Sequence, residues 1–95
     1  MKIEPRLPTD RQRRCLCEML YFALIEIRAL NWEGKTQQAA DLADAFHNLP
    51  IDMWLNDFSF EFFRDSFIAV YQQKYPGERS RDYVAMIDDI SKMKG

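Results

Sequence analysis

The sequence predicts an all-α protein, with four helices in a compact bundle or orthogonal array and the first helix at its centre. Four segments carry apolar residues at helical spacing, and the 95 residues include only three Gly and four Pro, too few for an architecture of many hairpins. Seven Phe, four Tyr and two Trp supply a large core for this length. We expect residues 1–8 to form an extended tail and residues 9–95 a single helical domain, because the chain leaves little room for a second.

The first helix is predicted from about Asp10 to about Asn31. Pro5 and Pro8 keep the residues before it extended. Thr9 provides an N-cap, and Gln12, three residues later, completes the spacing of a capping box, in which two backbone N–H groups gain side-chain acceptors. We therefore expect the helix to begin directly after Thr9.

This first helix is apolar around nearly its whole circumference. Of the 16 residues from Cys15 to Leu30, only three are charged. One apolar face includes Met19 and Ala23, but Tyr21 and Ile25 lie outside it. A helix that is apolar all round normally occupies the centre of a fold or an interface.

Glu26 borders the main apolar face of the same helix. An unpaired carboxylate in such a place is strongly destabilising, or it takes up a proton instead. We therefore expect Glu26 to be paired, with Arg64 or Arg28 as its partner.

Two further helices follow in the middle of the chain. The second is predicted from Thr36, as its cap, to about His47, and Pro50 ends it because proline cannot continue the hydrogen-bond ladder. A short turn at Met53–Leu55 leads to the third helix, which is predicted from about Ser59 to Tyr75.

The segment Asp57–Phe62 is the place where a strand competes with a helix. Polar and apolar residues alternate there, as in a half-buried strand. However, Phe60, Phe63 and Phe67 follow helical spacing over a longer stretch, and a lone strand would leave its backbone hydrogen-bonding groups without partners. The helix is therefore the preferred interpretation.

The fourth helix follows the break at Pro76–Gly77, with Ser80 as its expected cap. It carries a stripe of apolar residues at helical spacing, namely Tyr83, Met86, Ile87 and Ile90.

Charge is unevenly distributed along the chain. Residues 1–14 contain five basic and two acidic side chains, a net charge of +3, whereas residues 15–95 contain eight basic and 13 acidic ones, a net charge of −5. An acidic body with a short basic end differs from a nucleic-acid-binding protein, which spreads Lys and Arg over a docking face. We expect no nucleic-acid partner.

The sequence also predicts a cytoplasmic protein without a membrane partner. No apolar stretch follows the charged start as in a secretory signal, and the longest apolar run, Met19 to Ile25, is far shorter than a membrane span. In a reducing cytoplasm Cys15 and Cys17 are expected to be free thiols.

Asp44 and His47 suggest one chemical hypothesis. An acidic residue followed three positions later by His is half of the ligand motif of di-iron helical bundles. The chain contains a single His, so a symmetric dimer would have to duplicate the site, with other acids from the set Glu26, Glu61 and Asp65. A variant hypothesis uses His47 as a base for a nucleophile at Cys15 or Cys17. A helical metal-binding protein or enzyme that uses Asp44 and His47 is thus the alternative function.

The leading hypothesis is a non-enzymatic protein-interaction module, for which we expect no catalytic residue, metal or cofactor. The stretch Trp54–Phe67 contains more rings than one helical stripe can hold, and aromatic residues are enriched at association surfaces. The module is expected to be a homodimer, through a two-fold contact, or to bind an unidentified protein. The expected partner-binding residues, on the first and third helices, are Tyr21, Ile25, Phe58 and Phe62, with Arg28 at the rim.

The segment AADLADAFHNLP, residues 39–50, resembles segments of small uncharacterised bacterial all-helical proteins. This resemblance implies the all-α class and no particular activity. Gly34, Ala39 and Pro50 also resemble half of a tetratricopeptide repeat, but no second copy follows, so peptide binding is not implied.

Overall fold

The computed structural model describes residues 7–77 and 82–94, and these residues form five α-helices and one π-helix. The helices are α1 (Asp10–Trp32), α2 (Thr36–Phe46), α3 (Leu49–Trp54), α4 (Phe60–Phe67) and α5 (Tyr83–Ser91), and α4 continues directly into the π-helix η1 (Ile68–Gln72). No strand occurs within the described residues, which confirms the all-α prediction.

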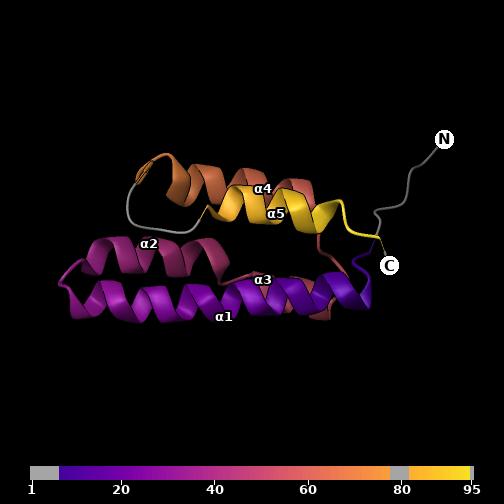
Figure 1. The fold of residues 1–95 in the computed structure, drawn as a ribbon, viewed down its shortest axis with the longest axis horizontal. Coiled ribbons are helices and arrows are strands. Elements are labelled where there is room, and N and C mark those ends of the chain that lie inside the picture. The colour runs from indigo at the N-terminus through magenta and orange to yellow at the C-terminus, as the bar shows by residue number, and fades with distance from the viewer. Residues whose placement is uncertain (1–6, 78–81, 95) are drawn as a thin grey trace.

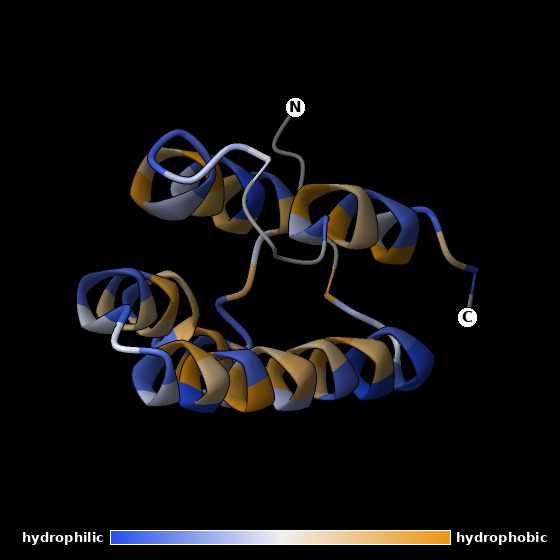
Figure 2. Ribbon diagram, turned by 60° about the vertical axis from the view of Figure 1, so that its left-hand side comes forward, coloured by the Kyte–Doolittle hydropathy of each residue, from blue (hydrophilic) through white to orange (hydrophobic). Residues whose placement is uncertain are grey.

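The helices form two layers that lie along the long axis of the molecule (Figure 1). One layer contains α1, α2 and α3, and the other contains α4 and α5. α1 packs against α2 and α5, while α2 also packs against η1 and α4. Figure 2 shows hydrophobic and hydrophilic residues alternating around the helices of both layers. Through α2 and α5, α1 contacts one helix of its own layer and one of the other layer. Among the described residues, these helices cover only the inner side of α1.

An aromatic cluster joins the two layers. Phe46 of α2 lies edge-on to Phe63 and Phe67 of α4 and to Tyr83 of α5, with ring centroids 5.4–5.7 Å apart. Phe67 and Tyr83 are completely buried. Edge-to-face pairs add about 0.5–1.5 kcal/mol each beyond the burial of their area. Phe46 is thus the side chain through which three helices share one core.

The predicted start of α1 is confirmed. Thr9 Oγ1 accepts a hydrogen bond from the backbone N–H of Gln12, and Gln12 Oε1 accepts one from the backbone N–H of Thr9, which completes the capping box. The amide nitrogen of Gln12 also donates to the carbonyls of Ile90 (3.0 Å) and Met93 (3.3 Å). Gln12 therefore caps α1 and holds the end of α5 against it.

The start of α2 and the role of Pro50 differ from the prediction, while the end of α2, at Phe46 with His47 as its cap, agrees with it. Thr36 is the first residue of α2 rather than its cap, which is Lys35 and makes no side-chain capping hydrogen bond. Pro50 lies in the first turn of α3 instead of only ending α2; proline is well suited there because the N–H that it lacks has no helical partner in a first turn. The expected turn at Met53–Leu55 is the end of this short helix.

The segment Asp57–Phe62, where the sequence pattern allows either a strand or a helix, is helical from Phe60 onward. Ser59 Oγ caps α4 by accepting from the N–H of Phe62, and the helical run through η1 ends at Gln72, three residues before the predicted end. The expected cap Ser80 lies outside the described residues, and the carboxylate of Asp82 caps α5 instead.

The predicted partners of Glu26 are wrong. Tyr83 donates its hydroxyl proton to Glu26 Oε2 over 2.5 Å, while Arg64 binds Asp88 of α5 at 3.2 Å and Asp65 at 3.6 Å. The hydrogen bond to Asp88 raises the pKa of Arg64. The reason is that α5 packs against both α1 and α4. It supplies Tyr83 as the partner of Glu26 and Asp88 as the partner of Arg64.

Within residues 7–77 and 82–94, no helix combines the length and the apolar character needed to cross a bilayer.

Candidate functional site

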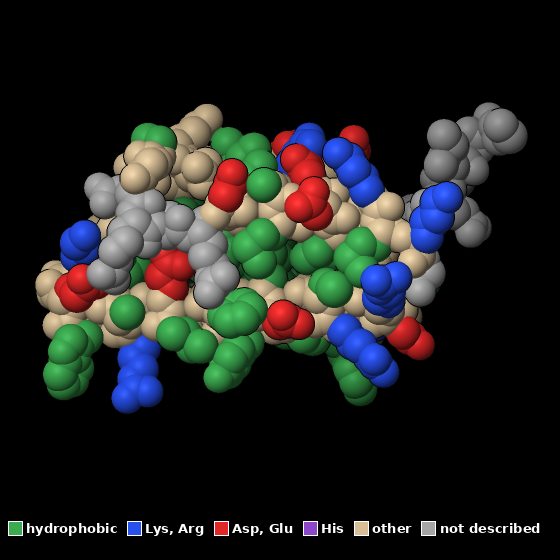
Figure 3. Space-filling model, viewed as in Figure 1, with side chains coloured by type: hydrophobic (Ala, Val, Ile, Leu, Met, Phe, Trp, Pro, Cys, Tyr) green, Lys and Arg blue, Asp and Glu red, His purple; other side chains and the backbone are tan. Residues whose placement is uncertain are grey.

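The outer side of α1 exposes a row of large apolar side chains. We call this surface the outer face of α1 and define it by Tyr21, Leu24, Ile25, Arg28 and Trp32. The exposed fractions of its apolar members are 61% for Tyr21, 55% for Leu24, 49% for Ile25 and 90% for Trp32. Figure 3 shows hydrophobic side chains and Lys or Arg projecting along the edge where α1 lies.

This exposure follows from the way α1 is packed. Its opposite side carries Leu16, Met19 and Ala23, which are completely buried, and Leu30, which is 1% exposed. These residues face the only helices that pack closely on α1 among the described residues, α2 and α5. A helix turns 100° per residue, so residues two or five positions away from a buried one lie on the opposite side. Tyr21 and Ile25, each two positions from Ala23, therefore face solvent. Contiguous exposed apolar side chains on the surface of a monomer are typical of an interaction site.

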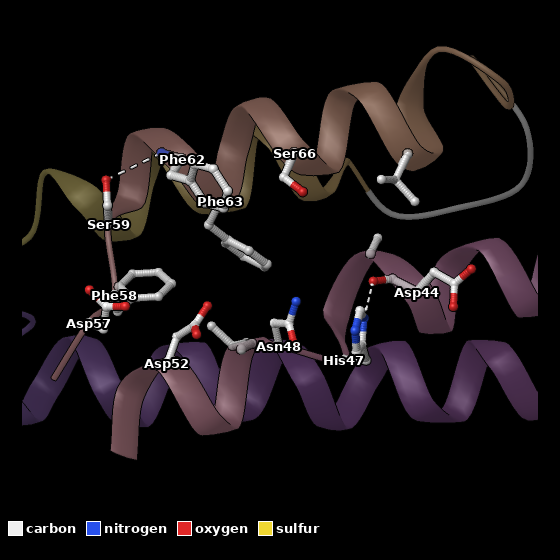
Figure 4. Close-up of a pocket in the computed structure, with 13 residues that line it drawn as sticks. Asp44, His47, Asn48, Asp52, Asp57, Phe58, Ser59, Phe62, Phe63 and Ser66 are labelled. Carbon is white, nitrogen blue, oxygen red and sulfur yellow. Dashed lines mark hydrogen bonds between the residues drawn. The ribbon is translucent and has the colours of Figure 1, made fainter. Parts of the chain in front are cut away.

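A second candidate site is a cleft between the two layers, with a volume of about 850 Å³ (Figure 4). α4 forms one wall, and α2 with α3 forms the other. Its polar rim contains the carboxylates of Asp44, Asp52 and Asp57 together with His47, Asn48, Ser59 and Ser66, and its apolar lining includes Phe58, Phe62 and Phe63.

The structure separates the five predicted partner-binding residues into two groups. Tyr21, Ile25 and Arg28 lie together on the outer face of α1, and all three are exposed. Phe58 and Phe62 line the cleft, to which α1 contributes no residue. One continuous surface through both helices, as the sequence predicted, does not form, because α5 and α2 rather than α4 pack against α1.

The predicted surface position of Phe58 is wrong. It is only 3% exposed and packs against Phe60 and Phe63, with ring centroids 4.9 and 5.7 Å apart. The segment before α4 is not helical, so the helical spacing that placed Phe58 on the outside does not apply. Phe62, by contrast, is 71% exposed at the rim of the cleft.

Asp44 and His47 both line the cleft, but their geometry is that of a helix end. His47 Nδ1 lies 2.7 Å from the backbone carbonyl oxygen of Asp44, and Figure 4 shows this contact as a dashed line. Neither of the other expected acids on α4, Glu61 and Asp65, lines the cleft. In the described part of the chain, no group of three or more His, Cys, Asp or Glu side chains is placed to hold a metal ion.

The cysteines do not join this site. Cys15 lines a separate, smaller cavity of about 220 Å³ with Met86 and Ile90, and Cys17 is exposed on α1. The cleft lining contains neither thiol, so His47 and a cysteine do not form a nucleophile–base pair across one cavity.

Asp41 is a buried carboxylate of α2, although the residue pattern of this helix predicts a solvent-facing position for it. It is 6% exposed and accepts hydrogen bonds from Tyr75 (2.6 Å) and Gln37 (3.1 Å), with Lys74 Nζ at 3.7 Å. The hydrogen bond from Tyr75 holds the pKa of Asp41 below its ordinary value, although burial acts in the opposite direction. These contacts fasten α2 to the segment after η1 and are structural.

Sequence reasoning also missed Leu24 and Trp32, which complete the outer face. Trp32 lies seven residues after Ile25, two helical turns further along the same side. This spacing is present in the sequence, although Trp32 lies beyond the apolar stretch Cys15–Leu30.

The chain was compared with family models, curated proteins and solved structures, and none of them matches it. The resemblance of residues 39–50 to small bacterial helical proteins therefore adds no functional information.

Proposed function

We propose that this protein is a non-enzymatic interaction module that binds a protein chain through the outer face of α1. The observation that carries the proposal is the exposure of Tyr21, Leu24, Ile25 and Trp32 in one row. Aromatic side chains contribute strongly to association because each buries a large area with few rotatable bonds. The partner is either a second copy, which makes a homodimer, or another protein.

The cleft is the weaker candidate. Its lining would suit the alternative, an enzyme or metal site at Asp44 and His47, only with further ligands. His47 is turned toward a backbone carbonyl, and the carboxylates Asp44 and Asp57 are exposed at the rim. The row on α1 is the more distinctive surface because its large apolar groups gain far more from being covered.

We also propose a reducing compartment, such as the cytoplasm, as the place where the module works. Cys15 and Cys17 are free thiols two residues apart on one helix. Residues at this spacing point to different sides of a helix, so the two thiols are poorly placed for a mutual disulfide.

Two matched isoleucine substitutions test the proposed surface. Ile25 on α1 and Ile51 on α3 are 49% and 48% exposed, so Ile25→Asp and Ile51→Asp place the same charge in equally accessible positions. Association is measured as self-association by sedimentation velocity and as proteins that co-purify from the native host.

We expect Ile25→Asp to abolish the association that the wild-type chain shows, and Ile51→Asp to retain it. A wild-type chain with no self-association and no co-purifying protein would contradict the proposal. Equal behaviour of the two variants would contradict it as well.

A further inference from the structure

The exposed side of α1 contains a regular row of six positions. This row extends beyond the outer face of α1 toward the start of the helix and does not include Leu24. The six positions, separated by steps of 4, 3, 4, 3 and 4 residues, fall within an arc of about 80° at 100° per residue. All six are exposed. They are Arg14, Glu18, Tyr21, Ile25, Arg28 and Trp32. Steps of three and four residues are those of a helix-pairing seam.

The positions of this row are symmetric about the level of Ala23. Arg14 and Trp32 are each nine residues from it, Glu18 and Arg28 are five residues away, and Tyr21 and Ile25 are two. An antiparallel helix with the same sequence, aligned at Ala23, therefore brings each residue next to its counterpart in the other copy.

Each of the three resulting pairs is chemically complementary. At the centre, Tyr21 meets Ile25 of the second copy and buries apolar area. Further out, Glu18 meets Arg28 of the second copy as an ion pair. At the ends, Arg14 meets Trp32 of the second copy, and a guanidinium over an indole ring is a favourable cation–π contact.

A parallel pairing of the same row is unfavourable. It would place Glu18 against Glu18, and Arg28 against Arg28, on adjacent helices. Like charges that face each other across a helix interface oppose association and select against that orientation.

We propose that the partner of the outer face of α1 is a second copy of this chain, held antiparallel with a two-fold axis at the level of Ala23. This inference rests on the proposed function and specifies its partner. Such a contact is isologous, so it closes with two copies and leaves no unpaired face to extend a filament.

Charge reversal tests the pairing. Glu18→Arg and Arg28→Glu each place like charges in both copies of the Glu18–Arg28 pair, so we expect each to weaken dimerisation at least tenfold in sedimentation velocity. The double variant Glu18→Arg/Arg28→Glu recreates the pair with its charges exchanged, and its dissociation constant should return to within about threefold of wild type. Glu61→Arg, an exposed change on α4, is the control and should leave dimerisation unchanged.

The orientation is measured separately with a spin label at position 31, in an Asn31→Cys variant that also carries Cys15→Ala and Cys17→Ser. At 1.5 Å per residue, antiparallel alignment at Ala23 separates the two labelled positions by about 24 Å along the helix axes. Parallel helices would hold them side by side, about 8–10 Å apart between the axes. Electron–electron distance measurement distinguishes the two.

The failures are distinguishable. A wild-type monomer at every concentration, together with a host protein whose binding is lost in Ile25→Asp, would overturn the second copy but leave the proposed function standing. A dimer that the double charge exchange does not restore, or that gives the short label distance, would overturn the pairing.

Discussion

Both sides of α1 carry large apolar side chains, but the surroundings of the two sides are opposite. On the inner side Leu16, Met19 and Ala23 are completely buried, whereas on the outer side Tyr21 and Trp32 are 61% and 90% exposed. Burial of a large apolar side chain contributes about 1.5–3 kcal/mol, and only the inner side gains it within one chain. α1 is therefore more hydrophobic than the fold of a single chain requires. The outer side of α1 does not contribute to the core of the monomer, so its apolar side chains remain accessible to a binding partner.

The sharpest way to test this difference is to make the same substitution on both sides. Leu16 is completely buried and Leu24 is 55% exposed on the same helix. Leu16→Ala removes buried methyl groups and leaves a cavity, so we expect it to lower the free energy of unfolding by about 2–5 kcal/mol. Leu24→Ala should change it by about 0.5 kcal/mol or less at a protein concentration low enough to keep the chain monomeric. Urea unfolding followed by circular dichroism measures both, and similar losses would show that the outer side also stabilises the monomer.

Two tyrosines, Tyr83 at the buried side and Tyr21 at the exposed side, allow the same test for polar groups. Tyr83 donates to Glu26 Oε2, and Glu26 Oε1 is buried without a hydrogen-bond partner among the described residues. Tyr83→Phe removes the donor and leaves a partly buried carboxylate, so we expect a loss of about 1–3 kcal/mol. Tyr21→Phe, on the exposed side, should have almost no effect on the unfolding of the monomer. Equal midpoints for the two variants would mean that Glu26 is solvated and that this part of α1 is open to water.

The smallest expected effect concerns pH. Because hydrogen bonding holds the pKa of Asp41 below its ordinary value, the ionised form stabilises the folded state. This stabilisation is fully present above the unfolded pKa of about 3.9 and is lost as the pH falls through the lower folded pKa. The advantage of wild type over Asp41→Asn should therefore shrink as the pH is lowered through this acid range. Asp44→Asn, at an exposed position of the same helix, is the control. An advantage for wild type that is constant with pH would contradict the assignment.

The features that were predictable from the sequence are those with local causes. The capping box of α1 depends on Thr9 and Gln12 alone, three residues apart, and it forms as expected. The helical interpretation of the segment after Ser59 was also correct, because the spacing of Phe63 and Phe67 outweighs a short alternation. The all-α class follows from such local signals in every segment.

The features that were not predictable depend on which helices meet. Glu26 pairs with Tyr83 rather than Arg64 because α5 packs against α1, and no periodicity encodes that choice. Phe58 was placed on the surface by helical spacing, but it precedes the helix and turns into the core. Of the expected site, Tyr21, Ile25 and Arg28 were found together because they share one helix, whereas Phe62 lies on another surface.

The fluorescence of Trp32 tests whether a second copy covers the outer face of α1. The chain contains two Trp residues, so Trp54→Phe, at an 82% exposed position on α3, leaves Trp32 as the reporter. Mass action makes dimerisation depend on concentration. We predict that the emission maximum shifts to shorter wavelength as the concentration rises, because the indole moves out of water against Arg14 of the second copy. The same series with Ile25→Asp added should keep the long-wavelength emission throughout. A long-wavelength maximum at every concentration without that substitution would contradict the claim.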